Sequence, residues 1–175
     1  IAKPLLVILI GEKWLQAVYF LQIICFSGML YPLHAINLNI LQVKGRSDLF
    51  LKLEVIKKII AIVPIVVGIF FGIEWMLVGN VFTSFFAYFL NSYYSAGLIL
   101  YPTIEQIKDI FPTFIISIIV AGVMWSLSFI PMSYYILLPI QIIIGLSLAL
   151  LIYGRLNLPE YLEVKQLVLA LLKQK

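Results

Sequence analysis

The segment FPTFIISIIVAGVMWSLSFI, residues 111–130, runs for twenty residues without a charged side chain. The hydrocarbon core of a bilayer needs about 20 apolar residues in helical form. A strand of a membrane barrel would alternate polar and apolar side chains over about 10 residues, and this segment does not alternate. Because a helix satisfies its own backbone hydrogen bonds inside lipid, the segment predicts a membrane-spanning helix and argues against a barrel.

The whole chain shares this character. Of its 175 residues, 63% are hydrophobic and 11% are charged, and the mean hydropathy is +1.12. Apart from His34, no titratable acidic or basic side chain occurs in residues 14–43, and none occurs in 75–104 or 110–154. A soluble domain carries about a quarter charged residues, so the composition indicates a membrane protein. With this hydropathy, the net charge of +4 points to membrane orientation rather than to a nucleic-acid partner.

We therefore predict an all-α polytopic membrane protein with five full spans and one partial span. Residues 155–175 should form an interfacial amphipathic tail helix, with Asn157 as its cap and Pro159 in its first turn. Residues 101–112, YPTIEQIKDIFP, should form a shorter helix of the same kind. The membrane part, residues 1–154, begins within a span, so we expect the chain to be the carboxy-terminal part of a longer protein. The predicted spans are 4–10 (partial), 14–42, 49–73, 75–100, 110–130 and 133–153, with a turn at 131–133.

Basic residues predict the orientation of these spans, because cytoplasmic loops carry an excess of lysine and arginine. One side of the predicted topology collects ten basic residues, whereas the other holds only Lys13. The loops after the second and fourth spans and the carboxy terminus should therefore be cytoplasmic. The ten are Lys44, Arg46, Lys52, Lys57, Lys58, Lys108, Arg155, Lys165, Lys173 and Lys175.

Two predicted helices carry long stripes of uncharged polar residues. Lipid offers such groups no partners, so they must face other helices or water. Interhelical hydrogen bonding and a hydrated cavity are both open, and the length of the stripes favours the cavity. On the second span, Gln16, Ser27, Tyr31, His34 and Gln42 lie within about 80°, flanked by Asn37 and Asn39. On the fourth, Asn80, Thr83, Ser84, Asn91, Tyr94 and Ser95 lie within about 120°.

Prolines and a histidine mark the second and third spans. Pro32 and Pro64 each remove a helical hydrogen bond and bend the axis, which leaves a static kink or a hinge as alternatives. His34 is a packing histidine, a substrate contact or a proton-coupling group. No carboxylate lies deep in the spans to share a proton with it, which disfavours coupling.

Lysines follow the second span within a short distance. Lys52, Lys57 and Lys58 stand at the start of the third span, and Glu54 has helical spacing to Lys57 and Lys58. The lysines either anchor the chain at anionic lipid headgroups or meet an anionic substrate that enters from the cytoplasm, since lysine binds phosphate well.

Motifs of enzymes are missing from the sequence. It contains no phosphate-binding glycine loop, no HExxH, no cysteine-rich metal spacing and no GxSxG elbow. Its one cysteine, Cys25, stands inside a predicted span and reads as a small apolar residue. We therefore expect a transporter, with no catalytic residue, metal or cofactor.

Residues 11–60 carry a resemblance to a known family. The segments YPLHAINLNIL (31–41) and KGRSDLFLKLEVIKK (44–58) closely resemble the second half of bacterial polysaccharide or lipopolysaccharide biosynthesis flippases. These proteins form the polysaccharide transporter family, which is related to the multidrug and toxic compound extruders. The likeness is weaker over the remaining spans and the tail.

The resemblance implies a protein of twelve or more helices in two lobes, of which this chain is the second and the amino-terminal lobe is missing. Such a protein moves oligosaccharides linked to undecaprenyl diphosphate across the bacterial cytoplasmic membrane, for O-antigen, capsule or exopolysaccharide. It further implies Lys52, Lys57 and Lys58 as headgroup or diphosphate contacts, and Tyr31, His34, Asn37, Asn80 and Asn91 as cavity contacts to the glycan.

Other functions stay open at this point. A cation-coupled drug or metabolite extruder of the related family should show a deep acidic residue, and this chain shows none. Part of a membrane-embedded glycan polymerase or ligase should have large outer loops, whereas the predicted outer loops are short. A structural membrane scaffold would not need the long polar stripes.

Overall fold

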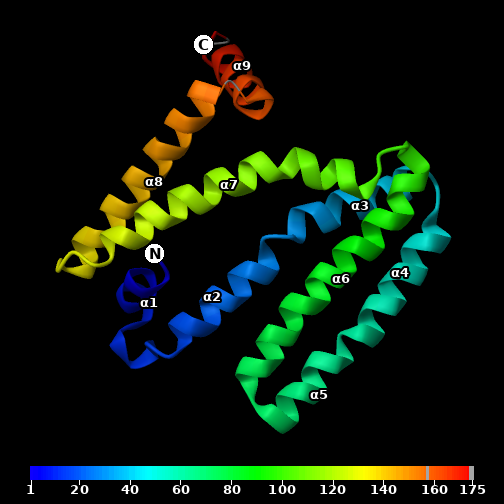
Figure 1. Cartoon of the computed structure of the whole chain (residues 1–175), viewed down its shortest axis with the longest axis horizontal. Helices are drawn as coiled ribbons and strands as arrows, with labels where there is room; N and C mark the ends of the chain where they lie inside the picture. Colours follow the sequence, from blue (N-terminus) through cyan, green and yellow to red (C-terminus); the bar gives the residue numbers. More distant parts are fainter. Residues whose placement is uncertain (157, 174–175) are drawn as a thin grey trace. The chain divides into compact units, whose positions relative to one another are not determined.

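The computed structural model describes residues 1–156 and 158–173. Over these residues the chain is helical and contains no strand, which confirms the all-α fold (Figure 1). Four helical stretches are long and apolar enough to cross a membrane, when α2 and α3 are counted as one. The helices are α1 (Ala2–Ile10), α2 (Ala17–Gly28), α3 (Tyr31–Val43), α4 (Ser47–Ile60), α5 (Ile62–Phe71), α6 (Ile73–Ile99), α7 (Thr103–Leu127), α8 (Tyr134–Leu156) and α9 (Pro159–Lys173).

The chain divides into two compact units. The larger unit is Ile10–Ile110 and contains α2 to α6 with the first two turns of α7. The smaller unit combines Lys3–Leu9 with Phe111–Lys175. The division falls inside the continuous helix α7, next to Pro112.

Helix α6 is the centre of the larger unit, and α2, α3, α4 and α5 all pack against it. Figure 1 shows α6 running back alongside α5 after a tight turn. Gly72 permits this turn because its φ is +94°, a value that glycine adopts without strain. The two helices then approach so closely that a Cβ at Gly68 would lie 2.7 Å from the Cβ of Met76. Leu41 of α3, Leu53 of α4 and Pro64 of α5 are fully buried.

The second predicted span is divided into two helices. It was predicted at 14–42, whereas the structure has a short 3₁₀ helix at Glu12–Trp14, then α2, then α3. The break covers Met29 and Leu30, shortly before Pro32, and both residues keep right-handed helical backbone angles. Proline has no N–H to donate to the carbonyl four residues earlier, and its ring crowds that carbonyl. The disturbance expected at Pro32 is therefore present as a two-residue turn between α2 and α3.

The third predicted span, 49–73, is likewise divided. Helix α4 ends at Ile60, Ala61 forms a turn, and α5 ends at Phe71. Pro64 stands in the first turn of α5, where a missing N–H costs least, and it is fully buried. Neither α4 nor α5 alone has the length to cross a bilayer.

The region before the fifth span differs most from expectation. Residues 101–112 were predicted as a separate interfacial helix with the span at 110–130, but α7 runs without interruption over Thr103–Leu127. Its start is held by polar contacts, because Thr103 accepts a hydrogen bond from Ser92 of α6 and Gln106 accepts one from Asn37 of α3. Pro112 lies inside the helix.

In the smaller unit, α7 and α8 pack through one buried amide. Gln141 of α8 donates hydrogen bonds to the carbonyl of Met124 at 2.8 Å and to the hydroxyl of Ser128 at 2.9 Å. The connection between the two helices includes residues 131–133, where the sequence places a turn. Helix α8 ends at Leu156 rather than near 153, so Arg155 belongs to its last turn.

The tail forms helix α9. Pro159 is its first residue, in the first turn where the sequence places it, and Tyr161 packs against Gly154 of α8. The predicted cap, Asn157, and residues 174–175 lie outside the described residues.

Candidate functional site

The larger unit contains a pocket at the level of both helix breaks. Its volume is about 400 Å³, and we call it the Lys57 pocket. Gly28, the last residue of α2, and Ile60, the last residue of α4, both border it. Pro32 and Pro64 have no N–H for the carbonyls of Gly28 and Ile60, so each of these two lining residues has a carbonyl without its helical donor. The residues lining the pocket are Ile24, Ser27, Gly28, Lys57, Ile60, Ala61, Leu77, Asn80, Thr83, Ser84, Phe86 and Ala87.

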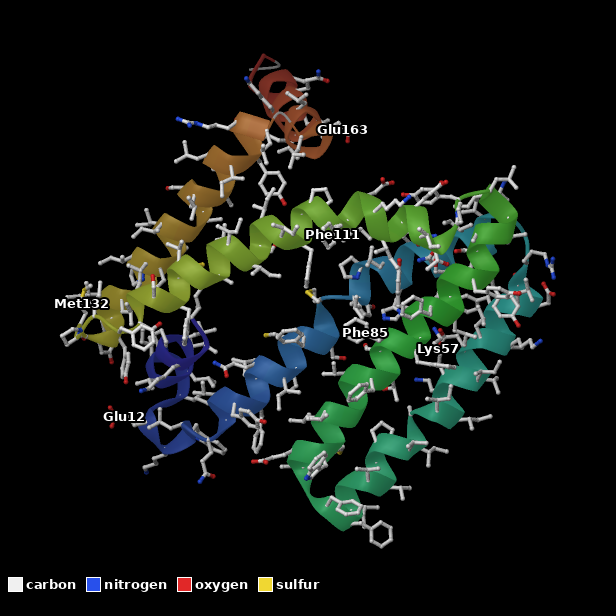
Figure 2. The ribbon with its side chains drawn as sticks, viewed as in Figure 1. Glu12, Lys57, Phe85, Phe111, Met132 and Glu163 are labelled. Carbon is white, nitrogen blue, oxygen red and sulfur yellow. The ribbon has the colours of Figure 1, made fainter. Side chains whose placement is uncertain are left out.

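Lys57 is the one charged side chain among the described residues that line the pocket. It shares a face of the α4–α5 segment with Leu53, Ile60 and Pro64, at spacings of four, three and seven residues. Because Leu53 and Pro64 are fully buried, this face is the one packed on α6, and Figure 2 shows Lys57 on that side of α4. The side chain of Lys57 is 18% exposed, and its ammonium forms an ion pair with Glu54 one turn earlier.

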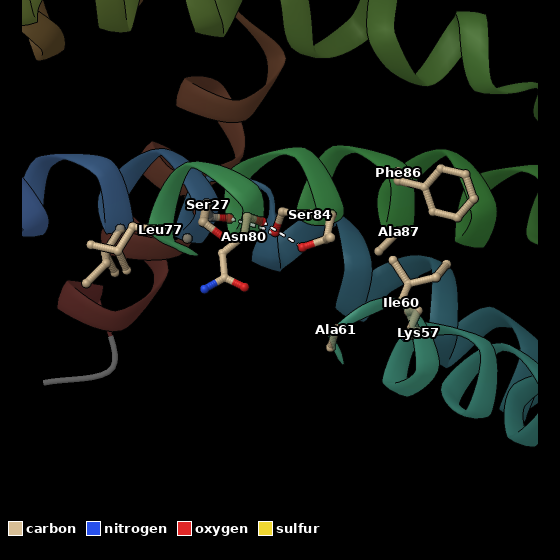
Figure 3. Close-up of a pocket in the computed structure, with 12 residues that line it drawn as sticks. Ser27, Lys57, Ile60, Ala61, Leu77, Asn80, Ser84, Phe86 and Ala87 are labelled. Atoms are coloured by element: carbon tan, nitrogen blue, oxygen red, sulfur yellow. Dashed lines mark hydrogen bonds between the residues drawn. The ribbon is translucent and has the colours of Figure 1, made fainter. Parts of the chain in front are cut away.

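Hydroxyl and amide groups complete the polar wall of the pocket. Ser27 of α2 donates a hydrogen bond to the hydroxyl of Ser84 of α6 at 3.0 Å, and Figure 3 shows this link beside Asn80. Thr83 donates to the backbone carbonyl of Asn80 at 3.0 Å. The amide side chain of Asn80 makes no hydrogen bond to any other described residue. The pocket thus offers an ammonium, hydroxyls and a free amide, which together suit a ligand with an anionic end and polar groups.

A second group of polar side chains lies further along α6 and is buried, and two of its members, Asn37 and Gln106, also border a smaller pocket of about 180 Å³. Asn91, Ser92 and Ser95 of α6, Asn37 of α3 and Gln106 of α7 are all buried. Asn37 donates to the side chain of Gln106 at 3.1 Å and to the carbonyl of Leu33 at 2.9 Å. The hydroxyl of Ser95 donates to Asn37. We call these five residues the sealed network, and hydrogen bonds within it contribute about 1 kcal/mol each.

His34 stands beside the sealed network. Its Nδ1 lies 3.3 Å from the side-chain nitrogen of Asn91, and its ring meets that of Tyr88 edge-on with centroids 6.3 Å apart. Within the described part of the chain, the hydroxyl of Tyr88 and the Oδ1 atom of Asn91 are buried without a hydrogen-bond partner. An unpartnered buried group costs about 1–3 kcal/mol, so the polar face of α6 is least well satisfied here.

The structure separates the residues that the sequence grouped as glycan contacts. Of the five, only Asn80 lines the Lys57 pocket. Asn37 and Asn91 are buried, and His34 contacts Asn91. Tyr31, expected at the middle of the stripe, is 72% exposed. Of the stripe on the second span, Ser27 and His34 contact α6, and Asn37 contacts it from the flank of the stripe.

The three lysines are separated as well. Lys52 is exposed, with its ammonium 5.9 Å from the ring centre of Tyr94. Lys58 is exposed and does not line the pocket. Lys57 alone among the three has its side chain in the pocket wall. The expected pairing of Glu54 with one of its neighbouring lysines is confirmed for Lys57.

Several polar residues of these clusters were absent from the predicted site, and Gln106 and Ser27 are two of them. Gln106 was assigned to an interfacial helix, although its spacing of three residues from Thr103 and four from Ile110 would place it on a buried face of α7. Ser27 was assigned to the stripe but not singled out as a contact. Among the described residues, no group of three or more histidine, cysteine, aspartate or glutamate side chains could hold a metal ion.

Comparison of the chain with models of protein families, with curated proteins and with solved structures yields no match.

Proposed function

We propose that this chain is the carboxy-terminal lobe of a flippase that moves undecaprenyl-diphosphate-linked oligosaccharides across the bacterial cytoplasmic membrane by alternating access. It is a transporter lobe, not an enzyme. Its partners are the bilayer, the lipid-linked oligosaccharide and an amino-terminal lobe. The observation that carries the proposal is the placement of one lysine, Lys57, in a polar pocket between apolar helices.

The depth of Lys57 supports a role with an anionic headgroup. Lys57 stands ten residues after Ser47, where α4 begins, and ten residues of helix span about 15 Å. In the proposed orientation, the turn between α3 and α4 faces the cytoplasm, and Lys57 then lies well inside the bilayer. A cation at that depth is costly unless it is paired or used. A diphosphate carried on a lipid could reach it while the lipid tail stays in the membrane.

The walls of the pocket support movement around a bound headgroup. Both helix interruptions, at Met29–Leu30 and at Ala61, adjoin it. Short interruptions with prolines absorb changes of backbone angle more readily than continuous helix. We take these two interruptions as the hinges of the proposed alternating access, with Asn80 as the contact to the sugar next to the diphosphate.

The test is a comparison of two neighbouring lysines. In the full-length protein, Lys57→Gln should reduce surface glycan at least about tenfold, because it removes the charge from the pocket. Lys58→Gln is the matched control, since it removes the same charge from an exposed position one residue away. Surface glycan would be measured by gel electrophoresis in a strain that depends on this protein, with protein level followed by immunoblot. Normal glycan with Lys57→Gln would overturn the proposal.

A further inference from the structure

Glu54 is the partner of Lys57. The two side chains are one turn apart and form an ion pair. Lys57 lines the pocket together with Ile60 and Ala61, whereas Glu54 is not among its lining residues. An anion in the pocket would therefore compete with the carboxylate of Glu54 for the same ammonium.

This ion pair is more shielded from water than the other ion pair of α4. The side chains of Lys57 and Glu54 are 18% and 34% exposed, whereas those of Arg46 and Asp48 are 45% and 63% exposed. Partial burial makes the loss of a partner expensive, because a charge left alone in a poorly hydrated place keeps its desolvation cost. Glu54 thus cannot be displaced from Lys57 without a compensating gain.

The rest of the pocket does not supply a second cation. The described residues of α2 and α6 that line it are uncharged, and so are those of α4 and α5 other than Lys57. With Glu54 in place, the pocket carries an ammonium whose charge is already balanced.

We infer that Glu54 is a specificity-determining residue. Every lipid headgroup must compete with its carboxylate for Lys57. This competition excludes singly charged phosphodiesters, whereas doubly charged diphosphate diesters bind. The inference rests on the proposed function, because it takes the pocket as the headgroup site. A phosphodiester such as phosphatidylglycerol has one negative charge. At Lys57 it only replaces the single charge of the Glu54 carboxylate, and it leaves Glu54 unpaired. A diphosphate diester brings more negative charge and more acceptor oxygens, which the hydroxyls of Ser27 and Ser84 and the amide of Asn80 can meet.

Such selection solves a problem that any lipid-accessible pocket has. Bulk phospholipids surround the protein in great excess over a lipid-linked oligosaccharide, and lysine binds any phosphate as a point charge. An unpaired Lys57 would be occupied by the commonest anionic lipid. Competition with Glu54 lowers the affinity for all headgroups and lowers it most for those with the least charge, so specificity comes from a repulsive element.

The experiment measures two lipids against the purified full-length protein in neutral detergent. The probes are undecaprenyl diphosphate linked to one N-acetylglucosamine, and phosphatidylglycerol. Apparent dissociation constants come from the rise of the melting temperature with lipid concentration. The wild-type protein should prefer the diphosphate, and Glu54→Gln should reduce that preference about tenfold or more by tightening the binding of phosphatidylglycerol.

Control variants separate selection from simple packing. Glu54→Asp keeps the carboxylate and should keep most of the preference, whereas a packing role would not depend on the charge. Glu74→Gln removes an exposed carboxylate from the first turn of α6 that does not line the pocket, and it should change neither constant. The melting temperature without lipid reports whether each variant is folded.

The results separate a failure of the inference on Glu54 from a failure of the proposed function. Three results would overturn the inference on Glu54. The first, which needs no variant, is that the wild-type protein does not distinguish the two lipids. The others are that the Glu54→Gln variant keeps the wild-type preference, or that this variant folds and binds neither lipid. In all three cases the proposed function stands as long as Lys57→Gln loses diphosphate binding. If Lys57→Gln binds the diphosphate as the wild type does, the proposed function itself fails.

Discussion

Helix α6 carries the same kinds of side chain on one face at two levels, and the two levels have different surroundings. Asn80 and Ser84 belong to the Lys57 pocket, whereas Asn91 and Ser95 are completely buried in the sealed network. Asn91 follows Asn80 by eleven residues, and Ser95 follows Ser84 by the same number. Eleven residues are about three helical turns, so both pairs lie on nearly the same face of α6. The difference therefore does not come from α6.

The helices opposite α6 cause the difference. At the level of Asn91 and Ser95, Asn37 of α3 and Gln106 of α7 fill the space with amides that bond to α6 and to each other. At the level of Asn80 and Ser84, the facing chains are interrupted after Gly28 and after Ile60. Glycine and alanine at these interruptions leave volume unfilled. A polar stripe on one helix thus predicts a polar contact, and the partner helices decide whether that contact is a packed seam or a pocket.

The largest expected effect tests the seam. Asn37→Leu removes the acceptor of Ser95 and the donor to Gln106, and it should lower the free energy of unfolding by about 1–3 kcal/mol because buried partners lose their bonds. Asn80→Leu is the matched change at the pocket and should cost less than about 0.5 kcal/mol. Equilibrium unfolding of the full-length protein in mixed detergent micelles measures both. Equal costs at the two positions would remove the distinction between seam and pocket.

A second experiment tests whether water reaches the two levels differently. Ser84→Cys and Ser95→Cys are the same small change on the same face of α6, introduced in a protein without other cysteines, Cys25 included. A charged methanethiosulfonate should label the cysteine at 84 at least about tenfold faster, a difference of about 1.4 kcal/mol in effective accessibility. Labelling would be followed by mass spectrometry under native conditions. Protection of both cysteines would mean that the pocket is closed to water and that the polar stripe is packing throughout.

The sequence was sufficient for the helical class but not for the interruptions of the helices. Charge-free runs indicated long apolar helices, of which the structure has four long and apolar enough to cross a membrane, and the polar face of α6 followed from helical spacing. Pro32 indicated a kink, yet nothing in the local sequence states how far a proline disturbs the helix before it. Helical spacing alone also placed Tyr31 in the stripe and Asn37 beside it, whereas Tyr31 is exposed and Asn37 is buried.

Helical spacing could have distinguished Lys57 from the other two lysines. Lys52, Lys57 and Lys58 have similar charge and neighbourhood in sequence, and they were predicted as one group. Only Lys57 shares a face with the apolar residues Leu53 and Ile60, and that face is the buried one. The pocket itself was beyond prediction, because its volume depends on the distance between α2, α4 and α6 rather than on the residues of any one of them.

The smallest effect concerns the water-exposed edge of the sealed network. The side chain of Gln106 donates a hydrogen bond to the carbonyl of Tyr101, and the hydroxyl of Tyr101 donates to the carboxylate of Asp109. This hydrogen bond to Asp109, with lesser contributions from burial and nearby negative charge, raises the pKa of Tyr101 to about 12. Tyr101 lies between α6 and α7, outside the membrane-spanning helices.

The sign of the pH effect follows from the raised pKa. The folded state holds the phenol proton more tightly than the unfolded state, whose tyrosine pKa is about 10, so the stabilisation is complete below about pH 10 and is lost as pH rises toward 12. Tyr101→Phe should remove this small loss of stability between pH 10 and 12, and Asp109→Asn should return the pKa of Tyr101 toward its usual value. Absorbance of tyrosinate at alkaline pH, taken as the difference between wild type and Tyr101→Phe, measures the pKa. An ordinary pKa in the wild-type protein would mean that the network ends at Gln106 and does not extend to the start of α7 exposed to water.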